Sequence, residues 1–349
     1  FGGYDGSNRV GKTEAYNGTS WSEDGDLSTA RNGLGGAGAT NTAALAVGGE
    51  GPPVTAATEE FTGAGAAVGA WSTGGNLNSA RRVAAGAGTS YSAAIMFGGT
   101  PSPLAALTES YDGTSWTEVN DLNTGRRDIA GNGSSTAAIA FGGDAPPYVG
   151  ATEIWNGTNW ATSPGSLTTA RAYMASAISG TSTATLGFGG YTTPPVSISA
   201  LTESWNGSSW TEVNDLNAAV ANHGGLGTST SALSFGGSDP GTTAGTELWN
   251  GTNWTEVANM NQSRNGLAGA GTNTAGLAFD GSDPKSGKTE EWNGVTWKVE
   301  ADLNTATTNP IGTGSATAAL KAGGEDATAV TAATEEWNSS STVIKTLTD

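Results

Sequence analysis

The feature that most constrains this sequence is an internal repeat. Eight copies of the dipeptide Thr-Glu follow one another at regular steps of 43 to 50 residues. Its copies begin at Thr13, Thr58, Thr108, Thr152, Thr202, Thr246, Thr289 and Thr334. A period of this length indicates a small structural unit that buries its apolar face only by packing against further copies of itself.

Each repeat predicts four short strands, which we call a to d. Strand a is a Gly/Ala-rich stretch that follows an Arg in most repeats, and strand b is an apolar run that ends in a Gly doublet, as in Phe97-Gly98-Gly99. Strand c contains Thr-Glu and an aromatic residue, and strand d opens with Trp, as in the segment 202–210. We expect these tryptophans to be structural and buried between neighbouring sheets. They include Trp21, Trp116, Trp160, Trp210, Trp254 and Trp297.

Turn and packing signals support the same assignment. An Asn-Gly pair lies between strands c and d in five repeats, for example Asn206-Gly207. Asn-Gly adopts positive φ at low cost, so it predicts a type I′ hairpin turn. The small residues of strand a suit a crowded position near a central axis. No segment shows a helical period of apolar residues.

A four-stranded meander repeated about every 45 residues is typical of a β-propeller. The Gly doublet, the aromatic residue of the next strand and the Trp of the last strand resemble the kelch repeat over essentially the whole chain. The phrase at 202–217, Thr-Glu-Ser-Trp-Asn-Gly-Ser-Ser-Trp-Thr-Glu-Val-Asn-Asp-Leu-Asn, is similar to kelch-like repeats of virion and tail-fibre proteins in tailed phages of marine bacteria. The resemblance implies an all-β, kelch-like β-propeller of four-stranded antiparallel blades.

We expect a single domain over residues 1–349. Residues 1–30 supply a partial c–d strand pair, and 31–349 supply seven repeat units, which predicts seven blades, with eight as the alternative. In another closure, the front c–d pair completes a blade with the a–b pair at 306–324, and the last c–d segment, where Thr342 replaces Trp, is surplus. The chain begins with Phe1 rather than Met, which indicates processing or a missing front part.

Composition excludes several functional classes. Acidic residues outnumber basic ones 32 to 14, and the formal net charge is −18, which excludes a simple nucleic-acid binder and disfavours an anionic membrane surface. The absence of cysteine excludes disulfides, thiolate metal sites and Cys nucleophiles. No apolar run is long enough to span a bilayer. With His223 as the single histidine, we expect no metal site and no cofactor.

Some motifs resemble catalytic or nucleotide-binding sites. Residues 6–13 match the P-loop pattern, which requires a following helix, whereas here Lys12-Thr13 opens a strand of the repeat. The repeated Glu could suggest the carboxylates of a glycosidase, but a catalytic pair does not recur in every blade. We expect each repeated Glu to contact the repeated Arg and tie strands together. His223 is expected to be structural.

The b–c loops are the candidate binding surface, because they vary between repeats and carry prolines and tyrosines on a rigid scaffold. The c–d turns on the opposite face are nearly constant. We therefore select Tyr4, Tyr148, Tyr191, Pro147 and Pro195 as binding residues, with no catalytic residue. A net charge of −18 favours a neutral or basic partner.

The resemblance implies a non-enzymatic virion component, such as a tail-fibre, head-fibre or decoration module, for attachment or particle packing. Its partners would be other virion proteins or a host-surface glycan or protein, without nucleic acid or membrane insertion, and an oligomer within a particle is compatible with this role. The location would be the virion or the extracellular space. The alternative is a secreted bacterial propeller that binds or cleaves carbohydrate.

Overall fold

The computed structural model divides into two compact units, namely Phe1–Val68 with Ser340–Asp349, and Gly69–Ser339. We expected a single domain over 1–349; each unit is described by itself below. The structure describes residues 2–16, 21–24, 27–32, 35–40, 43–47, 50, 58–61, 70–100, 105–193, 196–282 and 285–339.

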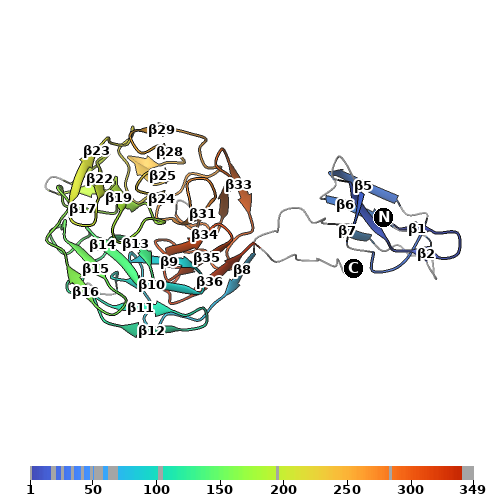
Figure 1. Cartoon of the computed structure of the whole chain (residues 1–349), viewed down its shortest axis with the longest axis horizontal. Coiled ribbons are helices and arrows are strands. Elements are labelled where there is room, and N and C mark those ends of the chain that lie inside the picture. The colour runs from blue at the N-terminus through green and yellow to red at the C-terminus, as the bar shows by residue number, and fades with distance from the viewer. Residues whose placement is uncertain are drawn as a thin grey trace. The chain divides into compact units, whose positions relative to one another are not determined.

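Gly69–Ser339 forms a ring of six four-stranded antiparallel sheets, or blades (Figure 1). Strands are given from the axis outward. Blade 1 comprises β9 (Ala85–Ser90), β10 (Ala93–Phe97), β11 (Thr108–Tyr111) and β12 (Trp116–Val119). Blade 2 comprises β13 (Ala130–Ser134), β14 (Ala137–Phe141), β15 (Thr152–Trp155) and β16 (Trp160–Thr162). Blade 3 comprises β18 (Ala175–Ser176), β19 (Thr185–Phe188), β22 (Thr202–Trp205) and β23 (Trp210–Val213).

The other three blades repeat this order. Blade 4 comprises β24 (Gly224–Thr228), β25 (Ser231–Phe235), β28 (Thr246–Trp249) and β29 (Trp254–Glu256). Blade 5 comprises β30 (Ala268–Gly271), β31 (Gly276–Phe279), β32 (Thr289–Trp292) and β33 (Trp297–Glu300). Blade 6 comprises β34 (Ile311–Ser315), β35 (Ala318–Ala322), β36 (Thr334–Asn338) and β8 (Ala70–Thr73).

Shorter strands complete the described part of the chain. In the ring, β17 (Arg171–Ala172), β20 (Tyr191–Thr192) and β21 (Ser197–Ile198) form one small sheet, and β26 (Ser238–Asp239) pairs with β27 (Gly241–Thr242). In the other unit, β1 (Gly3–Tyr4) pairs with β2 (Arg9–Val10), and β3 (Thr13–Tyr16) pairs with β4 (Trp21–Asp24). A three-stranded sheet there comprises β5 (Gly35–Thr40), β6 (Ala43–Val47) and β7 (Thr58–Phe61).

The all-β, kelch-like blade architecture is confirmed, but the ring holds six blades where we expected seven. The first of the seven repeat units after Arg31 is divided: its a, b and c strands form the β5–β6–β7 sheet, while its d strand, β8, completes blade 6. Trp71 of β8 pairs with Trp337 of β36. Trp71 therefore supplies the strand-d tryptophan of blade 6, since the last repeat has Thr342 at that position of its sequence.

The tryptophans that open strand d connect adjacent blades. Each indole Nε1 donates to the hydroxyl of the Thr in the Thr-Glu pair of the preceding blade. The pairs are Trp116–Thr334 (3.0 Å), Trp160–Thr108 (3.1 Å), Trp210–Thr152 (2.9 Å), Trp254–Thr202 (3.0 Å), Trp297–Thr246 (3.2 Å) and Trp71–Thr289 (2.9 Å). All six indoles are buried. Burial was predicted from the sequence for five of them, and Trp71 is the sixth. The side chain of Trp21 lies outside the described residues.

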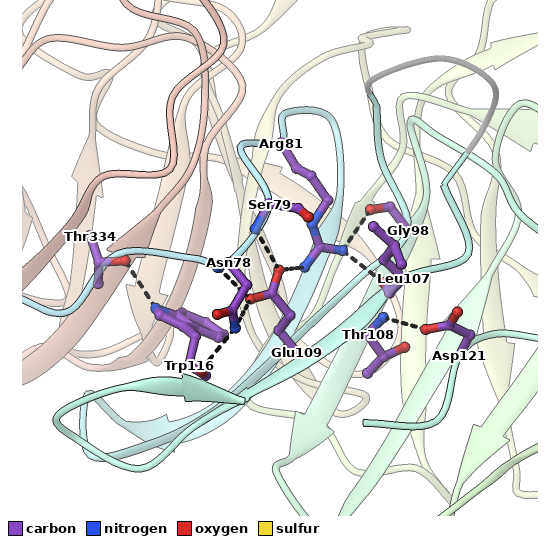
Figure 2. Close-up of polar contacts among 10 residues, drawn as sticks. All are labelled: Asn78, Ser79, Arg81, Gly98, Leu107, Thr108, Glu109, Trp116, Asp121 and Thr334. Carbon is purple, nitrogen blue, oxygen red and sulfur yellow. Dashed lines mark hydrogen bonds and ion pairs between the residues drawn. The ribbon is translucent and has the colours of Figure 1, made fainter. Parts of the chain in front are cut away.

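The Glu of each Thr-Glu pair stabilises its own blade. In blade 1, Glu109 accepts from Nη2 of Arg81 at 2.8 Å and from the backbone and side chain of Asn78 at 2.7 and 2.9 Å (Figure 2). Equivalent Arg–Glu pairs occur in blades 2, 3 and 5. The predicted Glu–Arg contact is confirmed, and it explains why Thr-Glu recurs as a pair: Thr links neighbouring blades and Glu links strands.

The c–d turns differ from the predicted type I′ hairpin. In blade 2, Trp155 pairs with Trp160, so four residues form the loop. Asn156 Oδ1 accepts the N–H groups of Thr158 and Asn159 at 2.9 and 2.8 Å, and of the Asn-Gly pair only Gly157, at 92°, has positive φ. The asparagine thus acts as a side-chain cap rather than as a left-handed turn residue.

Candidate functional site

Six residues, one from each blade, form a closed ring of backbone hydrogen bonds around the propeller axis. Each N–H donates to the carbonyl of the corresponding residue in the preceding blade. The bonds are Asp128–Val83 (2.8 Å), Tyr173–Asp128 (3.0 Å), Asn222–Tyr173 (3.0 Å), Gly266–Asn222 (2.9 Å), Asn309–Gly266 (2.7 Å) and Val83–Asn309 (3.2 Å). We call these six residues the axial ring. The last bond closes the ring and fixes the number of blades at six.

The axial ring adopts one unusual backbone conformation throughout. All six residues have φ between 51° and 59°, in the left-handed region that is uncommon for non-glycine residues. These residues line a cavity of about 110 Å³ at the mouth of the axis. The backbone is thus constant around the mouth, whereas the side chains differ in every blade except those of Asn222 and Asn309. Such a surface can recognise a ligand that lacks sixfold symmetry.

In five blades, an apolar residue follows the axial-ring residue in the sequence. In blade 4, His223 occupies this position. Neither ring nitrogen of His223 has a hydrogen-bond partner, and the side chain packs 5.6 Å from the ring of Phe188. Burial, with a smaller effect from the charge of Arg171, lowers the pKa of His223 to about 3. The imidazole is therefore neutral and serves as packing, as we expected.

A charged group lies beside the axial ring at blade 2. Arg127 donates to Asp144 Oδ2 through Nε at 2.9 Å and Nη2 at 2.7 Å, and its Nε lies 3.5 Å from Asp128. The Asp128 side chain is only 2% exposed, and its Oδ1 has no hydrogen-bond partner. Burial raises the pKa of Asp128 to about 7, although hydrogen bonding by Tyr173 and the charge of Arg127 oppose this shift.

Three tyrosines gather around this charged group. Tyr173 contacts Tyr191 edge to face, with ring centroids 5.5 Å apart. Tyr148 forms a β-bridge with Asp144, and burial together with the charges of Asp144 and Asp128 raises its pKa. We call Tyr148, Tyr173 and Tyr191, with Arg127, Asp128 and Asp144, the tyrosine cluster. All three tyrosines are partly exposed. Partly exposed phenol rings beside fixed charges can both stack on a ligand and hydrogen-bond to it.

The structure brings together part of the binding set expected from the sequence. Tyr148 and Tyr191 both belong to the tyrosine cluster, and Pro147 is exposed beside Tyr148. Tyr4 lies in the other unit, where it is 61% exposed and donates to the carbonyl of Ser7 at 3.2 Å. Pro195 lies outside the described residues.

The sequence interpretation did not include Asp128 or Tyr173. A signal existed, because the position two residues after the repeated Arg reads Val, Asp, Tyr, Asn, Gly and Asn in successive blades. The position was overlooked because it lies at the start of strand a rather than in a b–c loop. The fold brings these two kinds of position to the same mouth.

Other motifs have ordinary structural roles. The P-loop-like segment 6–13 forms the β1–β2 turn and enters strand β3, not a helix. Among the described residues, no three His, Asp or Glu side chains are grouped so as to hold a metal ion. The same part of the chain contains no helix of the length and apolarity needed to cross a membrane.

Comparison with known proteins supports the fold. No family model and no curated protein matches the sequence. The solved structure titled "Structure of YjhT" superposes with a TM-score of 0.59 over 74% of this chain and 96% of that chain, at 12% sequence identity. At this identity the similarity is one of fold alone.

Proposed function

We propose that this protein is a non-enzymatic attachment module that binds carbohydrate at the tyrosine cluster. The observation that carries the proposal is the grouping of Tyr148, Tyr173 and Tyr191 with polar side chains at one side of the axial mouth. The axial-ring side chains also differ between most blades, while their backbone is held by a closed ring of hydrogen bonds. Rigid scaffolds with variable surface residues are typical of recognition proteins.

The chemistry of the cluster suits a neutral sugar. Tyrosine rings provide apolar surface for the C–H face of a pyranose, and the phenol hydroxyls and the Arg127–Asp144 pair provide donors and acceptors for its hydroxyl groups. The acidic chain, with a net charge of −18, disfavours an anionic glycan.

Several observations favour binding over catalysis. The repeated glutamates of the ring accept hydrogen bonds within their own blades, and in four blades one donor is the buried arginine. Asp144 is paired with Arg127, and Asp128 is almost fully buried. A hydrolase needs an acid and a second carboxylate that both reach the scissile bond. We therefore infer a binding role.

The finer role that we propose is a virion component, on a tail fibre, head fibre or decoration module, that attaches the particle to a host-surface glycan. It is supported by the resemblance of the segment 202–217 to phage virion repeats. The two interlocking sets of contacts between blades would suit a part that bears mechanical load.

A glycan-binding assay with variants on both faces tests this function. The Tyr148→Ala, Tyr191→Ala double variant should lose binding to the glycans retained by the wild type, because the stacking surface is removed. Asn156→Asp and Asn206→Asp keep the turn acceptor on the opposite face and should bind normally. Loss of binding in the turn variants, with binding intact in the tyrosine variant, would place recognition on the other face.

One observation favours a second function, glycan cleavage. The pKa of Asp128, raised by burial to about 7, is suited to a general acid near neutral pH, and Tyr173 hydrogen-bonds with it. Incubation of the glycans with wild type and Asp128→Asn distinguishes the two functions. The binding role predicts no turnover by either protein; turnover by the wild type that Asp128→Asn abolishes would establish the enzyme.

A further inference from the structure

Four blades contain a buried arginine held in the same way. In each, Nη1 donates to two backbone carbonyls at 2.5 to 3.2 Å, and Nη2 donates to the Glu of the Thr-Glu pair at 2.8 to 3.0 Å. For Arg81 the carbonyls are those of Gly98 and Leu107, and the carboxylate is Glu109 (Figure 2). The arginines are Arg81, Arg126, Arg171 and Arg264. The fold therefore builds the same guanidinium site four times.

Blade 4 keeps the acceptors of this site but lacks its arginine. Val220 stands at the arginine position, and the residues equivalent to Gly98, Leu107 and Glu109 are Gly236, Gly245 and Glu247. Glu247 is held by Asn217, whose backbone N–H and Nδ2 donate to its Oε2 at 2.9 and 2.7 Å, as the equivalent Asn does in blades 1, 2, 5 and 6. Among the residues that the structure describes, no Lys or Arg forms an ion pair with this carboxylate.

A cavity of about 220 Å³ occupies the corresponding place in blade 4. Its walls include Val220, Gly236, Gly245 and Glu247, and the exposed residues Asp239 and Glu256 also line it. By comparison, an engineered cavity of about 150 Å³ in another protein holds benzene. Three acidic side chains and no basic one line the cavity, so its electrostatic potential favours a cation.

Blade 6 also lacks the arginine, but a buried positive charge lies nearby, next to an aspartate of blade 5 rather than next to the Thr-Glu carboxylate. There Thr307 replaces the arginine, and the buried ammonium of Lys321 lies 3.9 Å from Asp280, which accepts from the backbone N–H and the hydroxyl of Thr307 at 2.7 and 2.6 Å. At the position of Lys321, blade 4 has Ser234, which supplies no charge. Among the residues that the structure describes, blade 4 thus has neither the arginine nor another positive charge at this place.

We propose that the Val220 cavity is a binding site for a guanidinium group supplied from outside the chain. A planar guanidinium can donate to the two carbonyls and to Glu247 at once, which a spherical ammonium or metal cation cannot do with the same geometry. The group could come from a small alkylguanidinium or from an arginine side chain of a partner protein. The cavity is separate from the tyrosine cluster, so the proposal does not rest on the carbohydrate function.

Titration calorimetry of the full chain with ethylguanidinium tests the site. We expect saturable one-to-one binding, and at least tenfold weaker binding of ethylammonium. Val220→Arg fills the cavity with the side chain used in four other blades, so it should abolish binding and raise the melting temperature. Glu247→Gln removes the charge and retains an acceptor for Asn217, so it should also weaken binding at least tenfold. Tyr148→Ala should bind ethylguanidinium like the wild type.

A gain-of-site variant and a peptide complete the design. Arg171→Val should create the same cavity in blade 3, lower the melting temperature and bind a second ethylguanidinium that partly restores it. An acetylated and amidated Gly-Arg-Gly peptide that binds more tightly than ethylguanidinium would indicate a protein partner, and weaker peptide binding would indicate a small ligand. Absence of saturable binding to the wild type, equal binding of ethylammonium, or undiminished binding in Val220→Arg or Glu247→Gln would each overturn the proposal.

Discussion

Single residues at the axial mouth combine backbone strain with recognition. Val83 has a φ of 53°, and a β-branched residue in this region is a true conformational outlier. The backbone bonds to Asn309 and Asp128 hold it there. Strain of this kind typically costs about 1–3 kcal/mol and is tolerated where the surroundings enforce it.

We predict that Val83→Asn stabilises the ring. Asn tolerates the left-handed conformation and already occupies the equivalent position at Asn222 and Asn309. The free energy of unfolding, measured in urea, should rise by about 1 kcal/mol because part of the strain is removed. A decrease would show that packing of the Val83 side chain outweighs its backbone strain.

His223 provides a second prediction at this scale, with a defined pH dependence. Leu267 is its equivalent in blade 5, and both nitrogens of His223 lack partners, so His223→Leu should raise the free energy of unfolding by about 1–3 kcal/mol at neutral pH. The pKa is about 3 in the folded protein and about 6.5 when unfolded, so the wild type loses stability as the pH falls through this interval. The advantage of the variant should therefore grow below pH 6.5.

The measurement is a series of urea titrations between pH 4 and pH 8 for both proteins. A stability difference that stays constant with pH would mean that His223 is not buried in its neutral form. A less stable variant at pH 7 would mean that the imidazole has a partner that replaces water.

At the scale of strands, a few contacts explain why the repeat is so regular. The indole of the Trp that opens strand d donates a hydrogen bond to the Thr of strand c in the preceding blade. The Glu beside that Thr accepts a hydrogen bond from the Arg of its own blade. A change of the Thr therefore affects contacts between blades, whereas a change of the Glu affects contacts within one blade. The same carboxylate also fixes the d–a segment through Asn.

The interblade bond can be tested at Trp210 and Thr152. Trp210→Ala should lower the free energy of unfolding by about 3–5 kcal/mol, as for other buried large aromatics. In the wild type, the indole N–H of Trp210 donates to the Thr152 hydroxyl at 2.9 Å. Thr152→Val keeps the shape of the side chain but removes this acceptor, which should lower the free energy of unfolding by about 1–3 kcal/mol. Ser204→Ala in strand c, whose side chain is only partly buried, serves as the control. Equal stability of Thr152→Val and the control would refute the role given to this bond.

Local pattern was sufficient to predict the strands, the buried tryptophans and the Arg–Glu pair, because each depends on residues within one repeat or its neighbour. The turn type was wrong because the side chain of Asn156 competes with the backbone for hydrogen bonds. The grouping of Tyr148, Tyr173 and Tyr191 was predicted only in part. It depends on how the start of strand a and the b–c loops approach each other around the axis, which no local signal encodes.

At the scale of the molecule, ring closure depends on contacts that are remote in sequence. β8 pairs with β36, Trp116 donates to Thr334, and Val83 donates to Asn309, so three layers of contacts join the first and last parts of Gly69–Ser339. A repeat count alone gives seven units and cannot show that the first of them is shared between two compact units. The closed ring supplies the rigid frame on which the mouth residues vary.

The central claim, carbohydrate binding at the tyrosine cluster, is tested most directly by NMR of protein labelled with ¹³C in its tyrosine rings during titration with a glycan that it binds. The account predicts that the ring signals of Tyr148, Tyr173 and Tyr191 shift together and saturate, while that of Tyr111, buried at a blade interface and bonded to Glu336, stays unchanged. Saturable glycan binding that leaves these three signals unshifted would contradict the account.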